Sequence, residues 1–494
     1  MSTKVMSLRR RLFHGGAAGD AGLAGGRHIA SNVAIQLTAR LITMAIGVVT
    51  VSLTARTLSP DGYGVWSGVS SYVGLFGVLT DLGFTTAAMQ RMAAHPEREA
   101  EWLGALAGAR AAMSLVVMVV CAASVPILLS STGDRQTVGL ILTTTIFWGG
   151  ASALTTVFQS RLRAGMMLTF TVLQAVLWLG AVIVLASSKA SVAAFAIANA
   201  TVIGLMALLQ IQATRKLAHV AWRAGLSLWR PLARVAIPLG IANVFIIVYY
   251  QVDSVLLLQI AGEREAGIYG AAYGFLGPLI FLPAAVMSSF FPVLSAVQRS
   301  DPARVRRLVQ ICLDTMGVIG FPILAGTIAL SSQIIHLLYG TKFAGSSSVL
   351  EILMIAFVSI CFGMVAGLLA PVLNLQWRLA VYSGIGAAAN VVLNLLLIPS
   401  FGAHGSAWAT VVTEILTMVL MLSTCLYKLK LRPSAWKLLG ALSMAVAMTG
   451  VMVLARPLGL VPAGVIGVLF YAAGLLVTRT VDIRELRALR AQRG

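Results

Sequence analysis

The sequence predicts an all-α integral membrane protein with 14 transmembrane helices. Hydrophobic residues make up 59% of the chain and charged residues 11%, and the mean hydropathy is +0.91. Apolar stretches fill almost the whole chain, and each reaches the ~20 residues that a spanning helix needs. Such stretches are too long for the ~10-residue alternating strands of a membrane barrel. Helices are expected because lipid offers the backbone no hydrogen-bond partner.

Basic residues set the orientation of these spans. The expected spans are 30–56, 63–88, 102–130, 136–158, 164–187, 190–214, 234–261, 267–297, 308–332, 347–373, 379–399, 404–427, 436–456 and 461–479. The two tails and every second gap hold 28 of the 36 lysines and arginines. By the positive-inside rule, both termini are expected to be cytoplasmic. This topology accounts for the net charge of +20, so nucleic acid is not an expected partner.

A sequence echo divides the chain into two halves. Tyr63–Gly64 follows the first span, and Tyr269–Gly270 follows the seventh. Six spans in each half indicate a parallel repeat, a plan that secondary transporters use; a common interfacial turn is the alternative explanation. We expect a disordered basic cytoplasmic tail over 1–28, lobes over 29–214 and 234–427, an amphipathic cytoplasmic linker over 215–233, an appended helix pair over 428–480, and a basic cytoplasmic tail over 481–494.

The first span carries a polar stripe on one face. Its members recur every three or four residues, which places them on one side of a helix; they are Asn32, Gln36, Arg40, Thr43, Gly47, Thr50 and Thr54. Such a stripe lines either a wet cavity or a helix interface. An arginine at the bilayer centre costs ~2.5–3.5 kcal/mol even on the insertion scale, so Arg40 is not expected to face lipid. We therefore favour a cavity and predict that Asn32, Gln36 and Arg40 bind substrate.

Charged residues of the first lobe share a depth with this stripe. Arg40, Asp81 and Arg110 all fall in the cytoplasmic half of their spans. They are predicted to form a cluster with one excess positive charge. That cluster either binds an anionic substrate, with Arg110 as a second substrate residue, or fixes helix packing as an ion-pair network.

The second lobe offers carboxylates instead. Asp253 and Glu414 lie deep in their spans beside other polar residues, and buried carboxylates can exchange protons or ions as access alternates. With Asp81, they are the predicted coupling-ion residues. The four cysteines are scattered singly within spans, and the chain has no Walker loop, nucleophile elbow or metal-ligand spacing. No catalytic residue, cofactor or metal site is therefore expected, and the protein is not expected to be an enzyme.

Four segments resemble the signatures of polysaccharide exporters. ARTLSPDGYG, with a later D-x-G at Asp81, is similar to A-R-x-L-G-P-E-G-Y-G, and the segment from Tyr249 to Gly270 is similar to the seventh-span signature. LLYGTKFAGSSSVLEIL resembles the signature around span ten, and IPSFGAHGSAWATVVTE resembles that of span twelve, with Glu414 in place. The resemblance covers most of residues 30–430. It identifies the chain as a member of the multidrug/oligosaccharidyl-lipid/polysaccharide (MOP) exporter superfamily, in its Wzx-like branch.

The resemblance implies a V-shaped pair of six-helix lobes with alternating access. It implies a flippase for a polyprenyl-diphosphate-linked oligosaccharide in the bacterial plasma membrane, with a polysaccharide polymerase as a candidate partner beside the lipid bilayer. Lipid II flippases look richer in cavity arginines, whereas span eight here has none. Two alternatives stay open: a cation-coupled drug or metabolite antiporter like the MATE transporters of the same fold, and a non-transporting scaffold for glycan-polymerising enzymes.

Overall fold

The computed structural model describes residues 20–129, 133–151, 164–217, 221, 227–298 and 301–478, with side chains described from residue 38 onward apart from a few inner gaps. These residues form helices joined by short turns, without a strand among them. The helices are α2 (Asp20–Gly77), η1 (Val78–Thr80), α3 (Phe84–Ala94), η2 (Pro96–Arg98), α4 (Glu99–Leu128), α5 (Gly133–Ala151), α7 (Ala164–Ser187), α8 (Val192–Leu217), α10 (Trp229–Ile260), α11 (Glu263–Val297), α12 (Pro302–Tyr339), η4 (Thr341–Phe343), α13 (Ser346–Val372), α14 (Gln376–Leu429), α15 (Trp436–Ala455), η5 (Arg456–Leu458) and α16 (Leu460–Val477). The prediction of an all-α membrane protein is confirmed, because 10 helices in the described part are long and apolar enough to cross a bilayer.

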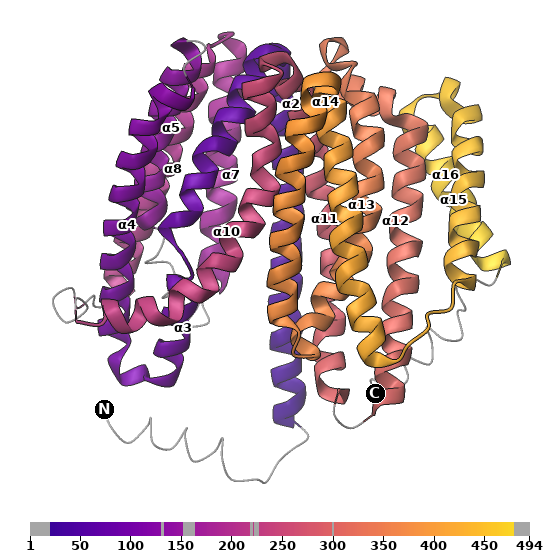
Figure 1. Cartoon of the computed structure of the whole chain (residues 1–494), viewed down its shortest axis with the longest axis horizontal. Coiled ribbons are helices and arrows are strands. Elements are labelled where there is room, and N and C mark those ends of the chain that lie inside the picture. Colours follow the sequence, from indigo (N-terminus) through magenta and orange to yellow (C-terminus); the bar gives the residue numbers. More distant parts are fainter. Residues whose placement is uncertain are drawn as a thin grey trace.

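Two of these helices each run through more than one predicted span, α2 through 30–56 and the first part of 63–88, and α14 through 379–399 and 404–427. α2 has 58 residues and α14 has 54, lengths of ~80–90 Å at 1.5 Å per residue, against ~30 Å of hydrocarbon. The backbone leaves the helical region at Ser59, where φ is 59°, and at Gly402, where φ is 52°. Pro60 disfavours helical geometry at the residue before it, and glycine adopts positive φ without steric cost. The chain folds back at both points (Figure 1), and the count of 14 crossings stays a prediction.

The first described helix begins inside the predicted tail. α2 starts at Asp20, whereas we expected a tail over residues 1–28. The predicted boundaries of the tail and lobes stay predictions. Residues 1–19 and 479–494 lie outside the described residues, as do residues 218–220 and 222–226 of the predicted amphipathic linker.

The helices form two groups joined by α10. In Figure 1, α4, α5, α7 and α8 stand on one side, and α11 to α14 stand on the other. The first part of α10 packs against α3 and α4, where Leu232 shares a buried cluster with Phe84 and Trp102. Helices α15 and α16 lie outermost and pack on α12 through a cluster that includes Met448 and Tyr471. The last two helices are therefore an appendage of the second group.

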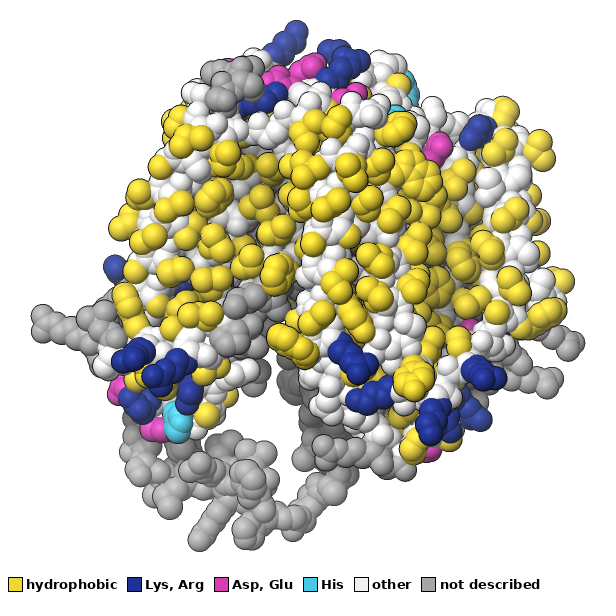
Figure 2. Space-filling view, viewed as in Figure 1, with side chains coloured by type: hydrophobic (Ala, Val, Ile, Leu, Met, Phe, Trp, Pro, Cys, Tyr) yellow, Lys and Arg dark blue, Asp and Glu magenta, His cyan; other side chains and the backbone are white. Residues whose placement is uncertain are grey.

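Charge separates the two ends of the molecule. We call the end that holds Ser59 and Gly402 the outer end, following the predicted topology, and the opposite end the inner end. Lysines and arginines line the lower, inner edge in Figure 2, whereas a smaller group of them shares the upper edge with acidic side chains. This distribution is the one that the positive-inside rule associates with a cytoplasmic inner end.

Candidate functional site

The two lobes touch at the outer end through glycines. A Cβ on Gly64 of α2 would lie 1.7 Å from the carbonyl oxygen of Glu263, and a Cβ on Gly267 of α11 would lie 1.9 Å from the carbonyl oxygen of Pro60. Only glycine allows the two backbones to approach this closely. Gly270 also packs against Tyr63. The two halves of the sequence echo therefore meet each other and close the outer end.

Polar side chains reinforce this closure. Arg135 of α5 pairs with Glu263 of α11 at 2.9 Å, and their side chains are 7% and 26% exposed. Arg56 of α2 donates to the carbonyl oxygens of Leu337 and Leu338 at the end of α12. We call Arg56, Arg135, Glu263 and the Gly64–Gly267 contact the outer latch. Arg456, at the same end, also donates to a carbonyl oxygen of α12, at 2.6 Å.

The inner end is open by comparison. Figure 2 shows the surface hollowed at the lower centre between the two halves. Arg40 lies in the inner half of α2, its side chain is exposed, and its guanidinium carbon lies 5.6 Å from the ring centroid of Phe281 in α11. It forms no ion pair with a carboxylate of the described residues, so it does not join the predicted three-residue cluster. The side chains of Asn32 and Gln36 lie outside the described residues.

The polar stripe of α2 divides into two parts. Toward the outer end, Thr50 and Thr54 are buried, and their hydroxyls donate to carbonyls of their own helix at 2.7 and 2.8 Å. This part of the stripe therefore serves helix packing. Toward the inner end, the Arg40 side chain is exposed.

Asp81 and Arg110 form a neutral pair. Arg110 Nη1 lies 3.5 Å from Asp81 Oδ1, and the arginine is 9% exposed. Its two Nη atoms donate at 3.3 Å to Thr85 Oγ1 and to the carbonyl oxygen of Gly149. The backbone N–H of Thr85 donates to Asp81 at 3.2 Å. These bonds tie α3, α4 and α5 together, so the geometry favours the packing network over the anion site for this pair.

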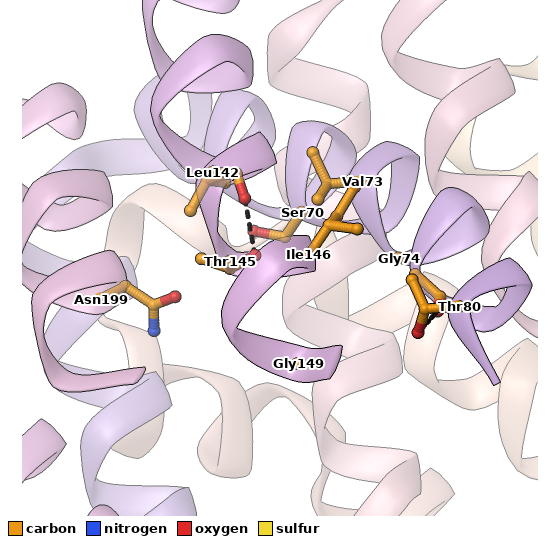
Figure 3. A pocket seen from close by; sticks show the side chains of 10 residues that line it. Ser70, Val73, Gly74, Thr80, Leu142, Thr145, Ile146, Gly149 and Asn199 are labelled. Atoms are coloured by element: carbon orange, nitrogen blue, oxygen red, sulfur yellow. Dashed lines mark hydrogen bonds between the residues drawn. The ribbon is translucent and has the colours of Figure 1, made fainter. Parts of the chain in front are cut away.

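A cavity of about 230 Å³ opens beside this pair. Its walls come from the second half of α2, from η1, from α5 and from α8, and they are Ser70, Val73, Gly74, Gly77, Thr80, Leu142, Thr145, Ile146, Gly149 and Asn199 (Figure 3). Sequence reasoning missed it, because single serines, threonines and glycines in apolar spans are too common to mark a site.

The second lobe buries two carboxylates in a hydroxyl- and amide-rich cluster. Asp253 is 3% exposed and accepts 2.8 Å hydrogen bonds from Tyr269, Asn394 and Thr410. These donors are all neutral, and no basic side chain of the described part pairs with Asp253. The amide of neighbouring Asn390 is also buried, at 1% exposed, beside the Asp253 carboxylate. The cluster thus offers oxygen atoms to a proton or a small cation.

Glu414 lies next to this cluster. It is 8% exposed and is an electrostatic neighbour of both Asp253 and Tyr249. Tyr249 donates to Thr413 at 3.2 Å. Two of the three predicted coupling residues, Asp253 and Glu414, are therefore brought together from α10 and α14, while Asp81 lies in the other lobe. Asn390 and Asn394 were not predicted, because asparagines at this spacing give no sequence signal of their own.

Comparisons with known proteins define the class. The described helices superimpose on the lipid II flippase MurJ in an inward closed conformation, with a TM-score of 0.72 over 91% of this chain and 98% of that one. An inward-facing MATE transporter of the MOP superfamily superimposes with a TM-score of 0.62 over 79% and 94%. Identity is 14% in both cases, so these likenesses establish the fold alone.

The chain belongs to the polysaccharide biosynthesis protein family, whose model matches residues 53–348. Two Haloferax volcanii proteins are similar to it in sequence. The probable flippase AglR is 29% identical over 176 residues, which is 35% of this chain and 37% of AglR. The probable low-salt glycan biosynthesis flippase Agl15 is 24% identical over 240 residues, which is 48% of this chain and 50% of Agl15. The chain thus matches half or less of the length of these curated relatives, and its predicted place in the MOP superfamily and its Wzx-like branch is confirmed.

Proposed function

We propose that this protein flips a polyprenyl-diphosphate-linked oligosaccharide from the cytoplasmic to the outer leaflet of a bacterial plasma membrane. The observation that carries the proposal is Arg40, a cation within a membrane-spanning helix that is exposed and forms no ion pair with a described carboxylate. A charge at that depth avoids lipid. The space between the lobes is then the place for this charge, and a diphosphate is the substrate group that suits an arginine there.

Alternating access supplies the mechanism. The outer latch holds the lobes together at one end, and the hollow separates them at the other. A sugar–diphosphate head group cannot cross hydrocarbon unaided, because burying unpaired polar groups costs several kcal/mol each. Opening the latch while the inner ends approach would move the head group across, with the polyprenyl tail staying in lipid throughout.

Replacing Arg40 tests this proposal. Arg40→Ala is expected to abolish glycan export while the protein still inserts and accumulates, because the head group loses its cation. Arg40→Lys is expected to keep partial export, since the charge remains but the two-pronged contact with a phosphate is lost. Arg378→Ala is the matched control, because Arg378 is exposed at the inner start of α14, outside the spans. Normal export by a well-expressed Arg40→Ala protein contradicts the proposal.

We propose further that Asp253 and Glu414 couple transport to a proton or sodium gradient. The support is their burial together without a basic partner in the described part of the chain. A coupling carboxylate must change its occupancy between inward- and outward-facing states, because only a difference in affinity shifts that equilibrium. The same observation favours the second candidate function, a cation-coupled drug or metabolite antiporter, because unpaired carboxylates also suit cationic substrates.

Neutral variants test the coupling. Asp253→Asn and Glu414→Gln mimic the permanently protonated forms, and at least one is expected to transport at a rate that no longer responds to an imposed gradient. The measurement is head-group uptake into inverted vesicles with and without that gradient. Glu351→Gln is the control, because Glu351 is a span carboxylate that accepts from Ser331 elsewhere in the lobe. If the gradient still raises the uptake rate of both variants as it does for the parent, coupling lies elsewhere. If the gradient drives uptake of an organic cation and not of the glycan, the antiporter is favoured.

A further inference from the structure

The cavity inside the first lobe has polar groups on several walls. Ser70 comes from α2, Thr80 from η1, Thr145 from α5 and Asn199 from α8. Figure 3 shows Asn199 on one side of the space, with Ser70 and Thr145 across from it. The volume of about 230 Å³ is below the ~300–1,000 Å³ that drug-sized ligands occupy. It suits one small ring and excludes a whole oligosaccharide.

Two glycines create this space. A Cβ added at Gly77 or at Gly149 would meet nothing within 4 Å, so each faces open volume where a larger side chain would stand. Gly74 on the same wall differs, since its Cβ would lie 3.2 Å from the side chain of Gln251. The cavity thus depends on the absence of side chains at Gly77 and Gly149, and any residue larger than glycine there would fill it.

The hydrogen-bonding groups suit a neutral hydroxylated ligand. The hydroxyls of Thr80 and Thr145 already donate to their own helices at 2.8 and 2.6 Å, so their lone pairs are left to accept from a ligand. The Asn199 amide has both donors and an acceptor, and it makes no hydrogen bond with the described residues. Because the Asn199 side chain is half-buried at the cavity wall, its amide is accessible to a ligand in the cavity.

Electrostatics argue against a charged ligand. No lining residue carries a charge, and the adjoining Arg110 and Asp81 neutralise each other. Arg110 approaches the cavity only through the carbonyl oxygen of Gly149, to which it donates. A cationic drug would find no carboxylate here, and a diphosphate would find no free cation. Sugar hydroxyls, which donate and accept, match the walls.

We infer that this cavity is a subsite for one sugar ring of the lipid-linked glycan, distinct from the head-group contact at Arg40. The inference rests on the proposed flippase function. It assigns to the first lobe the recognition of a sugar beyond the one attached to the diphosphate. The residues that read that sugar are Asn199, Thr145 and Thr80, and the open glycines Gly77 and Gly149 give it room.

Filling the cavity tests the inference. Gly149→Val places a branched side chain in the open volume, and Asn199→Leu removes the amide at nearly constant size. Gly180→Val is the matched control, because Gly180 also has nothing within 4 Å of its Cβ but lies on the exposed face of α7. Export is measured for two substrates in cells: the host's complete lipid-linked glycan, and the same lipid carrying only its first sugar.

The expected result is selective. Gly149→Val and Asn199→Leu should each lower export of the complete glycan by about tenfold or more, the discrimination that about one methylene achieves in a fitted pocket. Both should export the single-sugar lipid like the parent, and Gly180→Val should export both substrates. If Gly149→Val exports both substrates like the parent, or exports neither, the sugar subsite is overturned. Failure of the parent to export either substrate overturns the flippase function instead.

Discussion

Breaking the Arg135–Glu263 pair should open the outer end of the transporter. The pair joins α5 of the first lobe to α11 of the second at 2.9 Å, so it exists only while the outer ends are together. Removing one partner of a buried ion pair costs ~3–5 kcal/mol. Because the Glu263 side chain is 26% exposed, water screens part of this interaction, and we take about 2 kcal/mol for Arg135→Ala. That value shifts the equilibrium toward the outward-open state by about 30-fold, since 1.4 kcal/mol is tenfold.

Cysteine accessibility measures this shift. Ser67 faces Gly270 at the glycine contact, so the thiol of Ser67→Cys is shielded while the outer end is closed. Its rate of modification by a membrane-impermeant maleimide added from outside reports the fraction of open molecules. The four native cysteines are buried, and the protein without Ser67→Cys supplies their background. Arg135→Ala is expected to raise the rate by about 30-fold.

Two controls make the reasoning refutable. Arg264→Ala removes an exposed cation next to Glu263 at the same end and should leave the rate unchanged. The effect of Arg135→Ala combined with Glu263→Ala should be less than the sum of the two single effects, because both changes remove the same ion pair. The latch is refuted if Arg135→Ala labels no faster than Arg264→Ala, or if the two effects simply add.

Two further predictions concern contacts within and between the lobes. Asp81→Asn should lower protein level or export by leaving Arg110 buried without its counter-charge, and adding Arg110→Gln should recover part of the loss. Immunoblots measure the protein level and glycan export measures the activity. If the double variant loses as much as the two single variants together, the residues do not interact. Gly64→Ala should abolish export and expose the outer end, because its Cβ would lie 1.7 Å from the Glu263 carbonyl oxygen. The control Gly47→Ala, whose Cβ meets nothing within 4 Å, should leave export intact. Equal export by both variants would show that the glycine contact is not needed for transport.

The sequence by itself determined the class of structure and the family. Hydropathy predicts the spans because the bilayer requires a minimum length of apolar helix. The basic residues predict the orientation because they gather on the cytoplasmic side. The described residues are helical throughout the predicted spans apart from short breaks, whereas the ends of the helices differ from the predicted bounds and the count of 14 crossings stays a prediction. Asp253 and Glu414 were found for the same reason, since a carboxylate deep in an apolar span is costly and stands out. The exporter signatures around Tyr63 and Tyr269 indicated the family, and the family match confirms it.

Only the tertiary structure decided which residues meet. The sequence places Arg40, Asp81 and Arg110 at a similar depth in the membrane, but it does not show which neighbouring helix each side chain faces. Packing joins Arg110 to Asp81 and leaves Arg40 over Phe281 of the other lobe.

The remaining features are also long-range. Asn394 reaches Asp253 only because α14 packs on α10, and the open space at Gly149 appears only when α2, α5 and α8 stand around it. Helical periodicity and hydropathy are properties of neighbours in the chain. Pairing and cavities depend on contacts between separate helices, which only the folded lobes bring together.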